Sequence, residues 1–235
     1  STVGTHGLEV LGSLGKLVGT LYIALAIFIV FVLGSVIALF KVPLRKFVSA
    51  VKEPAWLAFS TTSSEAALPK AMQAMEAMGV PRHIVSFVLP VGYAFNLDGT
   101  TLYLSLAAMF VAQAAGVHLS IQTQLMMLLT LMLTSKGVAA VPRASLVILA
   151  GTLATFNLPL SGVALILAVD ALMDMARTSV NVIGNCLASV VMAQWEGVFG
   201  QAHPHEIAVM ADEGTNVSIT TEHASLHEPA SVPVA

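Results

Sequence analysis

The sequence predicts an all-α membrane protein, and three observations carry this prediction. The chain is 57% hydrophobic and only 10% charged, and its mean hydropathy of +0.87 is far above that of a soluble domain. Leu17–Phe40 is a run of 24 residues without a charge, and this length is enough to span a bilayer as one helix. Closer to the C-terminal end, charged side chains lie inside a segment that is otherwise apolar. These features predict that the protein lies in a lipid bilayer. The sequence has no basic patch of the kind that binds nucleic acid, so no nucleic-acid partner is predicted.

The first predicted element is a transmembrane helix at residues 1–40. Its apolar run exceeds the roughly 15 residues of the longest secretory signal cores, so we expect a spanning helix and not a signal peptide. A short loop with four basic residues follows: Lys41, Arg45, Lys46 and Lys52. The positive-inside rule places such a loop in the cytoplasm.

Three interrupted apolar segments come next, at residues 41–80, 81–117 and 118–160. The interruptions lie at residues 60–64 and Pro69, at Pro90, Gly92 and residues 96–99, and at residues 134–137 and Pro142. Irregular backbone survives at membrane depth only where it is buried in protein or lines a wet cavity. Apolar segments broken by Gly or Pro at matching places in two halves are typical of a secondary-transporter binding site.

The last predicted helix, at residues 161–197, carries six polar side chains on one face. A helix advances about 100° per residue, so these side chains share one sector roughly 100° wide. They are Asp170, Asp174, Arg177, Thr178, Asn181 and Asn185. Ionisable groups at membrane depth cost about 2.5–3.5 kcal/mol each and mark ion or substrate pathways. The alternative interpretation is a buried structural ion-pair cluster between helices.

Three motifs resemble those of the glutamate/aspartate transporter family, the dicarboxylate/amino acid:cation symporters. They are Ser63-Ser64 followed by Leu68-Pro69, the run Asn96–Thr100, and the run Asp170–Gly184. The resemblance covers about residues 8–197 and corresponds to the C-terminal half of such a protein.

This resemblance implies a glutamate-transporter-type core with an inverted repeat. Residues 1–40 would be the family's sixth transmembrane helix, residues 81–117 its broken helix 7, and residues 161–197 its polar-cored helix 8. Residues 41–80 and 118–160 would be two re-entrant helical hairpins, which enter and leave the membrane on the same side. A homotrimer would form through a scaffold domain that is absent from this chain.

The resemblance also implies a pocket for an acidic amino acid, which has two carboxylates and one ammonium. Arg177 offers a planar fork of donors and would hold the side-chain carboxylate of the substrate. Asp174 would pair with the ammonium and Asn181 with the α-carboxylate. Thr178 and Thr100 would add hydrogen bonds. Because a C4-dicarboxylate has no ammonium, the presence of Asp174 favours glutamate or aspartate, with C4-dicarboxylates as the alternative.

Other residues would support or close this pocket. Asp170 lies two turns from Arg177 on the same face and would support it without touching substrate. The hairpin tips would close over the substrate, with Ser63 and Ser64 in the first and Val141 and Pro142 in the second.

The coupling ion is predicted to be a proton, with sodium as the alternative. The family's sodium-coupled members have an aspartate where this chain has Asn185, and the loss of a negative charge removes much of the attraction for a cation. The resemblance places ion coupling at Glu65, Gly92, Asn96, Asp98, Asn181 and Asn185. Glu65, Asp98 and Asp174 are the candidate proton carriers, because burial disfavours a charged carboxylate. Glu65 fits a solvated cytoplasmic charge equally well.

The remaining expectations concern the whole chain. We expect a multi-pass protein of the cell (inner) membrane, with residues 198–235 as a disordered cytoplasmic tail. A single cysteine, Cys186, excludes an intrachain disulfide and a multi-cysteine metal site. No enzyme activity, cofactor or metal is predicted, and the aspartyl-protease motif Gly-x-Gly-Asp is absent. A membrane fragment or packing module that does not transport is the alternative of another class.

Overall fold

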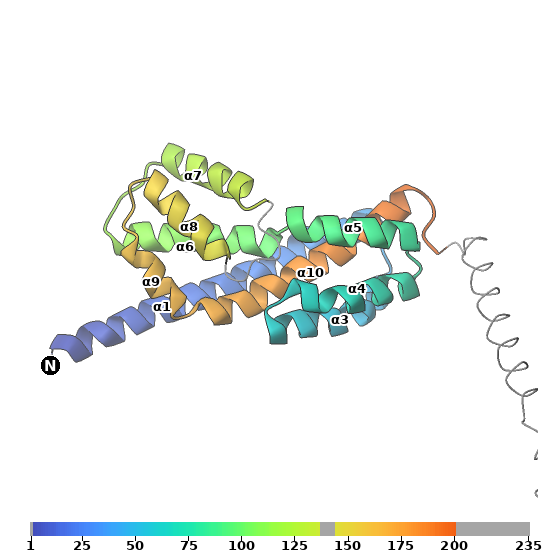
Figure 1. Cartoon of the computed structure of the whole chain (residues 1–235), viewed down its shortest axis with the longest axis horizontal. Coiled ribbons are helices and arrows are strands. Elements are labelled where there is room, and N and C mark those ends of the chain that lie inside the picture. Colours follow the sequence, from blue (N-terminus) through green and yellow to red (C-terminus); the bar gives the residue numbers. More distant parts are fainter. Residues whose placement is uncertain (1, 137–143, 201–235) are drawn as a thin grey trace, which may run out of the picture. The chain divides into compact units, whose positions relative to one another are not determined.

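The computed structural model describes residues 2–136 and 144–200, with side chains from Val10 onward, and all regular elements in these residues are helices (Figure 1). In chain order they are α1 (Thr2–Ile27), the π-helix η1 (Phe28–Leu33), α2 (Gly34–Leu39), α3 (Leu44–Thr61), α4 (Ser64–Met78), α5 (Arg82–Phe95), α6 (Asp98–Ala114), α7 (Ile121–Thr134), α8 (Ala144–Thr155), α9 (Ser161–Leu167) and α10 (Asp170–Trp195). The prediction of an all-α chain is confirmed for these residues. The predicted tail lies, from residue 201 on, outside them.

The first helical run is the most apolar part of the described chain. Val10–Leu39 extends over 30 residues and contains an 18-residue stretch with a mean hydropathy of 2.8, of which only 17% is buried. At about 1.5 Å per residue such a helix exceeds the thickness of a bilayer core. Its exposed side chains include Ile23, Val30 and Phe31. A surface of this kind is suited to contact with lipid or with another apolar surface.

Helices α3 and α4 form a packed pair with a tight connection. Thr62 adopts a left-handed conformation (φ 54°), which ends α3. Ser63 then begins α4, because its side-chain oxygen accepts a hydrogen bond from the backbone N–H of Ala66 at 3.2 Å. The interruption predicted at residues 60–64 is therefore a helix-capping turn. That this pair is re-entrant stays a prediction.

Helices α7 and α8 form a second packed pair, and both lie against α6. Ser120 caps α7 by accepting a hydrogen bond from the N–H of Thr123 at 3.2 Å. The connection between the two helices, residues 137–143, lies outside the described residues. The predicted site residues Val141 and Pro142 fall in it.

Two further helices are interrupted near the middle of the fold. Between α5 and α6 the residues Asn96 and Leu97 are not helical. The helix predicted as continuous over residues 161–197 is divided at Ala168 and Val169, directly before α10 begins. Both of these residues make short-range bonds to carbonyls three residues earlier, which tightens the backbone into a turn. The division places Asp170 in the first turn of α10, where the helix dipole favours a carboxylate.

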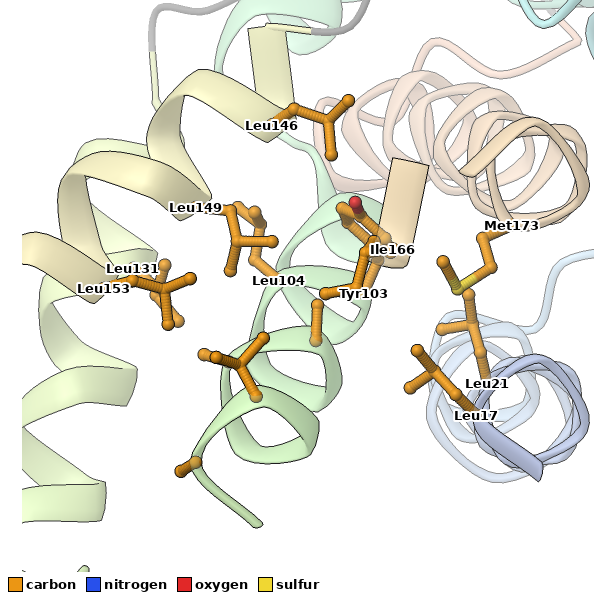
Figure 2. Close-up of a cluster of buried hydrophobic side chains, with 14 of the residues drawn as sticks. Leu17, Leu21, Tyr103, Leu104, Leu131, Leu146, Leu149, Leu153, Ile166 and Met173 are labelled. Carbon is orange, nitrogen blue, oxygen red and sulfur yellow. The ribbon is translucent and has the colours of Figure 1, made fainter. Parts of the chain in front are cut away.

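Helix α10 connects two hydrophobic core clusters. The first core cluster joins α1 and α6–α9, and α10 contributes Met173, Ala176 and Val180 to it. Figure 2 shows this cluster, with Met173 beside the leucines of α1 and with Tyr103 between them and α8. The second core cluster joins α3, α4 and α5, and α10 contributes residues from Val182 to Ala193. The polar face of α10 therefore lies where one cluster gives way to the other.

Candidate functional site

Arg177 is the centre of the polar face of α10. Its side chain is 4% exposed, and its Nε donates a hydrogen bond to Asp174 Oδ1 at 2.9 Å. Its Nη1 lies 3.7 Å from Asp170 Oδ1, and its Cζ lies 4.0 Å above the ring of Tyr103. A buried guanidinium is tolerated only with such partners, because an unpaired buried charge is strongly destabilising.

Tyr103 is a site residue that the sequence analysis missed. Its ring faces Arg177, and its hydroxyl donates a hydrogen bond to Asp170 Oδ1 at 3.0 Å. Tyr103 and Asp170 are both buried. The signal that could have found it is a tyrosine within the apolar run of α6, because a buried tyrosine hydroxyl usually requires a hydrogen-bond partner.

Asp174 is the most accessible member of this group, with a side chain that is 17% exposed. Its Oδ1 accepts hydrogen bonds from Arg177 Nε and from Thr178 Oγ1, both at 2.9 Å. In the described part of the chain both hydrogen bonds of Asp174 are made by Oδ1, and the buried atoms Arg177 Nη1 and Asp170 Oδ2 have no hydrogen-bond partner. The described hydrogen bonds of this group therefore leave Asp174 Oδ2 and Arg177 Nη1 unused.

Asn181 bridges α10 and the start of α6. Its Oδ1 accepts hydrogen bonds from the backbone N–H groups of Gly99 at 2.8 Å and Thr100 at 3.4 Å. Its Nδ2 donates to Thr100 Oγ1 at 2.9 Å. Leu97, the residue before α6, has no side-chain cap of its own, so Asn181 supplies the cap from another helix. Asn181 was predicted to bind the α-carboxylate or the ion, and both polar atoms of its side chain thus have protein partners.

The backbones of α6 and α10 approach closely at this cap. A Cβ atom on Gly99 would lie 2.4 Å from the carbonyl oxygen of Arg177, which is too close for any side chain. Glycine at this position therefore allows α6 to begin directly against α10.

Several of the predicted ion-coupling residues lie around Asn185. Its Nδ2 donates to the backbone carbonyls of Asn181 at 2.9 Å and Asn96 at 3.3 Å. Its Oδ1 accepts from Asn96 Nδ2 at 3.2 Å. A Cβ atom on Gly92 would lie 2.1 Å from Asn185 Oδ1, and one on Gly184 would lie 3.2 Å from Asp98 Oδ2. Gly92, Asn96 and Asp98 thus lie against the C-terminal half of α10.

The first hairpin tip makes its hydrogen bonds locally. Ser63 Oγ donates to Glu65 Oε2 at 3.0 Å, and both belong to the turn that begins α4. In the described part of the chain, no hydrogen bond or ion pair joins Ser63, Ser64 or Glu65 to the polar face of α10. The same part of the chain contains no group of three His, Cys, Asp or Glu side chains placed to hold a metal ion.

The comparisons with known proteins agree with one another. Residues 1–195 match the model of the Sodium:dicarboxylate symporter family. The chain is 49% identical over 219 residues to the "Proton/sodium-glutamate symport protein" of Bacillus subtilis, which covers 93% of this chain and 51% of that protein. It is 48% identical over 198 residues to the "Proton/glutamate-aspartate symporter" of Escherichia coli, covering 84% of this chain and 45% of the relative.

A relative with a different name is nearly as similar. The "C4-dicarboxylate transport protein" of Anaeromyxobacter dehalogenans is 44% identical over 233 residues, covering 99% of this chain and 52% of that protein. The chain spans about half the length of these curated relatives.

Proposed function

This chain belongs to the sodium:dicarboxylate symporter family, and we propose that it forms the substrate-binding part of a proton-coupled symporter for glutamate or aspartate. The observation that carries the proposal is the Asp170–Asp174–Arg177 group on α10, in which Arg177 Nη1 and Asp174 Oδ2 take no part in the described hydrogen bonds. The family is one of membrane transporters and not of enzymes.

Charge complementarity supports an amino diacid as the substrate. Arg177 Nη1 can donate a hydrogen bond to a carboxylate of the substrate, while Asp174 Oδ2 can accept one from its ammonium group. A diacid without an ammonium would bring a second negative charge near Asp174 with nothing to offset it. C4-dicarboxylates are the second candidate substrates, favoured by the 44% identity to a C4-dicarboxylate transport protein.

The hydrogen bonds of Asn185 support a proton as the coupling ion. Its Nδ2 is directed at two backbone carbonyl oxygens, which are groups that a sodium ion would otherwise attract. The amide carries no negative charge, so the surroundings of Asn185 do not fit a sodium ion. Sodium remains the alternative coupling ion, and the name of the Bacillus subtilis relative includes it.

The proposal extends to the architecture around the site. The pairs α3–α4 and α7–α8 would be the two re-entrant hairpins of an inverted repeat, each lying against a broken helix. This unit would lie in the lipid bilayer of the cell (inner) membrane with its C-terminus in the cytoplasm. It would move as an elevator against a homotrimeric scaffold.

Uptake by a chimera tests the proposal. This chain replaces the C-terminal half of the Bacillus subtilis relative, and the chimera is reconstituted in proteoliposomes. We expect uptake of radiolabelled glutamate or aspartate under an imposed pH gradient without sodium. Arg177→Ala should abolish it, whereas Arg45→Ala, which removes an exposed cation, should not. Uptake that survives Arg177→Ala would contradict the substrate site, and uptake that requires sodium would contradict proton coupling.

A further inference from the structure

The side chain of Asn185 has only one acceptable orientation. One end faces the carbonyl oxygens of Asn181 at 2.9 Å and Asn96 at 3.3 Å. Carbonyl oxygens only accept hydrogen bonds, so this end must be the amide nitrogen. The oxygen of Asn185, Oδ1, must therefore face the side chain of Asn96.

This orientation determines how Asn96 is placed. Because Asn185 Oδ1 is an acceptor, Asn96 presents its nitrogen to it, at 3.2 Å. The oxygen of Asn96 then faces Asp98, at 3.1 Å from Oδ1 and 3.2 Å from Oδ2. An ionised carboxylate also only accepts hydrogen bonds, so an ionised Asp98 would leave three oxygens together without a hydrogen.

Rotating the Asn96 amide by half a turn moves this conflict and does not remove it. Its nitrogen would then donate to both oxygens of Asp98, but its oxygen would lie 3.2 Å from Asn185 Oδ1. Asn185 cannot rotate in response, because its own oxygen would then face the two backbone carbonyls. One additional hydrogen between Asp98 and Asn96 satisfies every group in the chain of bonds.

We propose that Asp98 carries this hydrogen as a protonated carboxylic acid, donates it to Asn96 Oδ1, and is the residue that carries the coupled proton. This inference rests on the proposed function. The proton comes from water on one side of the membrane and returns to water on the other, so that only an O–H bond forms and breaks.

The surroundings of Asp98 suit a group that must also release its proton. Asp98 is half-buried in the first turn of α6, where the helix dipole favours negative charge. The ammonium of Lys136, which follows α7, is close enough to interact with it electrostatically. From α10 the neighbouring group is the neutral Gly184, and the charged Asp174 and Arg177 pair with each other. Dipole and ammonium thus oppose the effect of burial.

The hydrogen bonds of the other two candidate carriers, Asp174 and Glu65, do not require a protonated carboxyl group. Asp174 Oδ1 accepts two hydrogen bonds, one of them from the Arg177 guanidinium, as an ionised carboxylate does. Glu65 is exposed, and its Oε2 accepts from Ser63. The described hydrogen-bond partners of Asp174 and Glu65 are donors, so neither carboxylate needs a proton in order to make these bonds.

Infrared difference spectroscopy of this chain in lipid nanodiscs tests the proposal without requiring transport. A protonated carboxyl group has a carbonyl stretch separate from that of a carboxylate. We expect this band at neutral pH, its loss in Asp98→Asn, and its retention in the matched control Glu65→Gln. A band that persists in Asp98→Asn, or no band in the parent chain, would overturn the proposal.

A second measurement does not depend on a substitution at position 98. Labelling with carbon-13 aspartate should shift the band, and the shifted band should persist in Asp170→Asn and in Asp174→Asn. A shift with labelled glutamate alone, or loss of the band in either variant, assigns it elsewhere and overturns the proposal. If the band is found but the chimera shows no uptake, only the transport proposal fails. Uptake without the band contradicts only the role of Asp98.

Discussion

Asn181 accepts a hydrogen bond from the backbone N–H of Gly99 at 2.8 Å, although 82 residues separate the two in the sequence. The bond fixes the start of α6 against α10, one turn beyond Arg177. The proposed substrate-binding group and the proposed ion-coupling group therefore meet at one junction between α6 and α10, and the following predictions concern it.

Replacing Asn181 with Ala should destabilise the fold. The substitution leaves the N–H groups of Gly99 and Thr100 without their acceptor. Loss of a cap costs about 1 kcal/mol, and buried unsatisfied groups cost about 1–3 kcal/mol. Chemical unfolding in detergent should show a decrease of that size. Gln122→Ala, an exposed change on α7, serves as the control and should have little effect.

Replacing Gly99 with Ala should destabilise the junction more than a glycine substitution elsewhere. The new Cβ would lie 2.4 Å from the carbonyl oxygen of Arg177, so one of the two backbones has to move. Gly151→Ala is the matched control, because a Cβ there meets nothing within 4 Å in the middle of α8. Removing a glycine from a helix interior should stabilise by roughly 0.5–1 kcal/mol. Melting temperatures that shift in the same direction in both variants would contradict this account.

Tyr103→Phe should weaken the support of Arg177 without removing the ring above it. The variant removes the hydrogen bond to Asp170 Oδ1 and leaves a buried carboxylate with one donor fewer. We expect a loss of about 1–3 kcal/mol in the free energy of unfolding. Tyr103→Leu also removes the cation–π contact and should cost roughly 0.5–2 kcal/mol more. Equal stability of the Phe variant and the parent would show that the hydroxyl is unimportant.

Asp174→Ala should change the substrate preference of the chimera. Without this carboxylate the ammonium of glutamate loses its partner, and a charge-assisted hydrogen bond is worth about 1.5–3 kcal/mol. The affinity for glutamate should therefore fall roughly 10- to 100-fold, while that for succinate should not fall. Competition of both compounds against radiolabelled uptake measures the change. A parallel loss of both affinities would indicate that Asp174 maintains the site without selecting the ammonium.

The sequence predicted those parts of the site that depend on local geometry. The periodicity of one helix was enough to place six polar residues on a common face, and the structure buries five of them, with Asp174 half-buried. The interruption at residues 60–64 could also be predicted from the sequence, because a serine cap after a left-handed residue is a local feature. The role of these residues in binding stays a prediction.

Contacts between distant segments could not be predicted in the same way. The bond from Tyr103 to Asp170 joins residues 67 positions apart, and no local pattern fixes which helix faces which. The division between α9 and α10 was missed because neither Ala168 nor Val169 is a helix breaker. The carboxamides of Asn181 and Asn185 were expected to serve ligands, but their hydrogen bonds to α6 and to backbone carbonyls are tertiary.

The passage of α10 through both core clusters has a mechanical consequence. A single rod of 26 residues holds side chains on either side of the polar groups, and close packing lets neither side slip along it. We therefore expect the two halves of this bundle to move together, with the charged centre between them. We expect a bound molecule to move together with this unit. Its entry would then require movement of the connections between the helices.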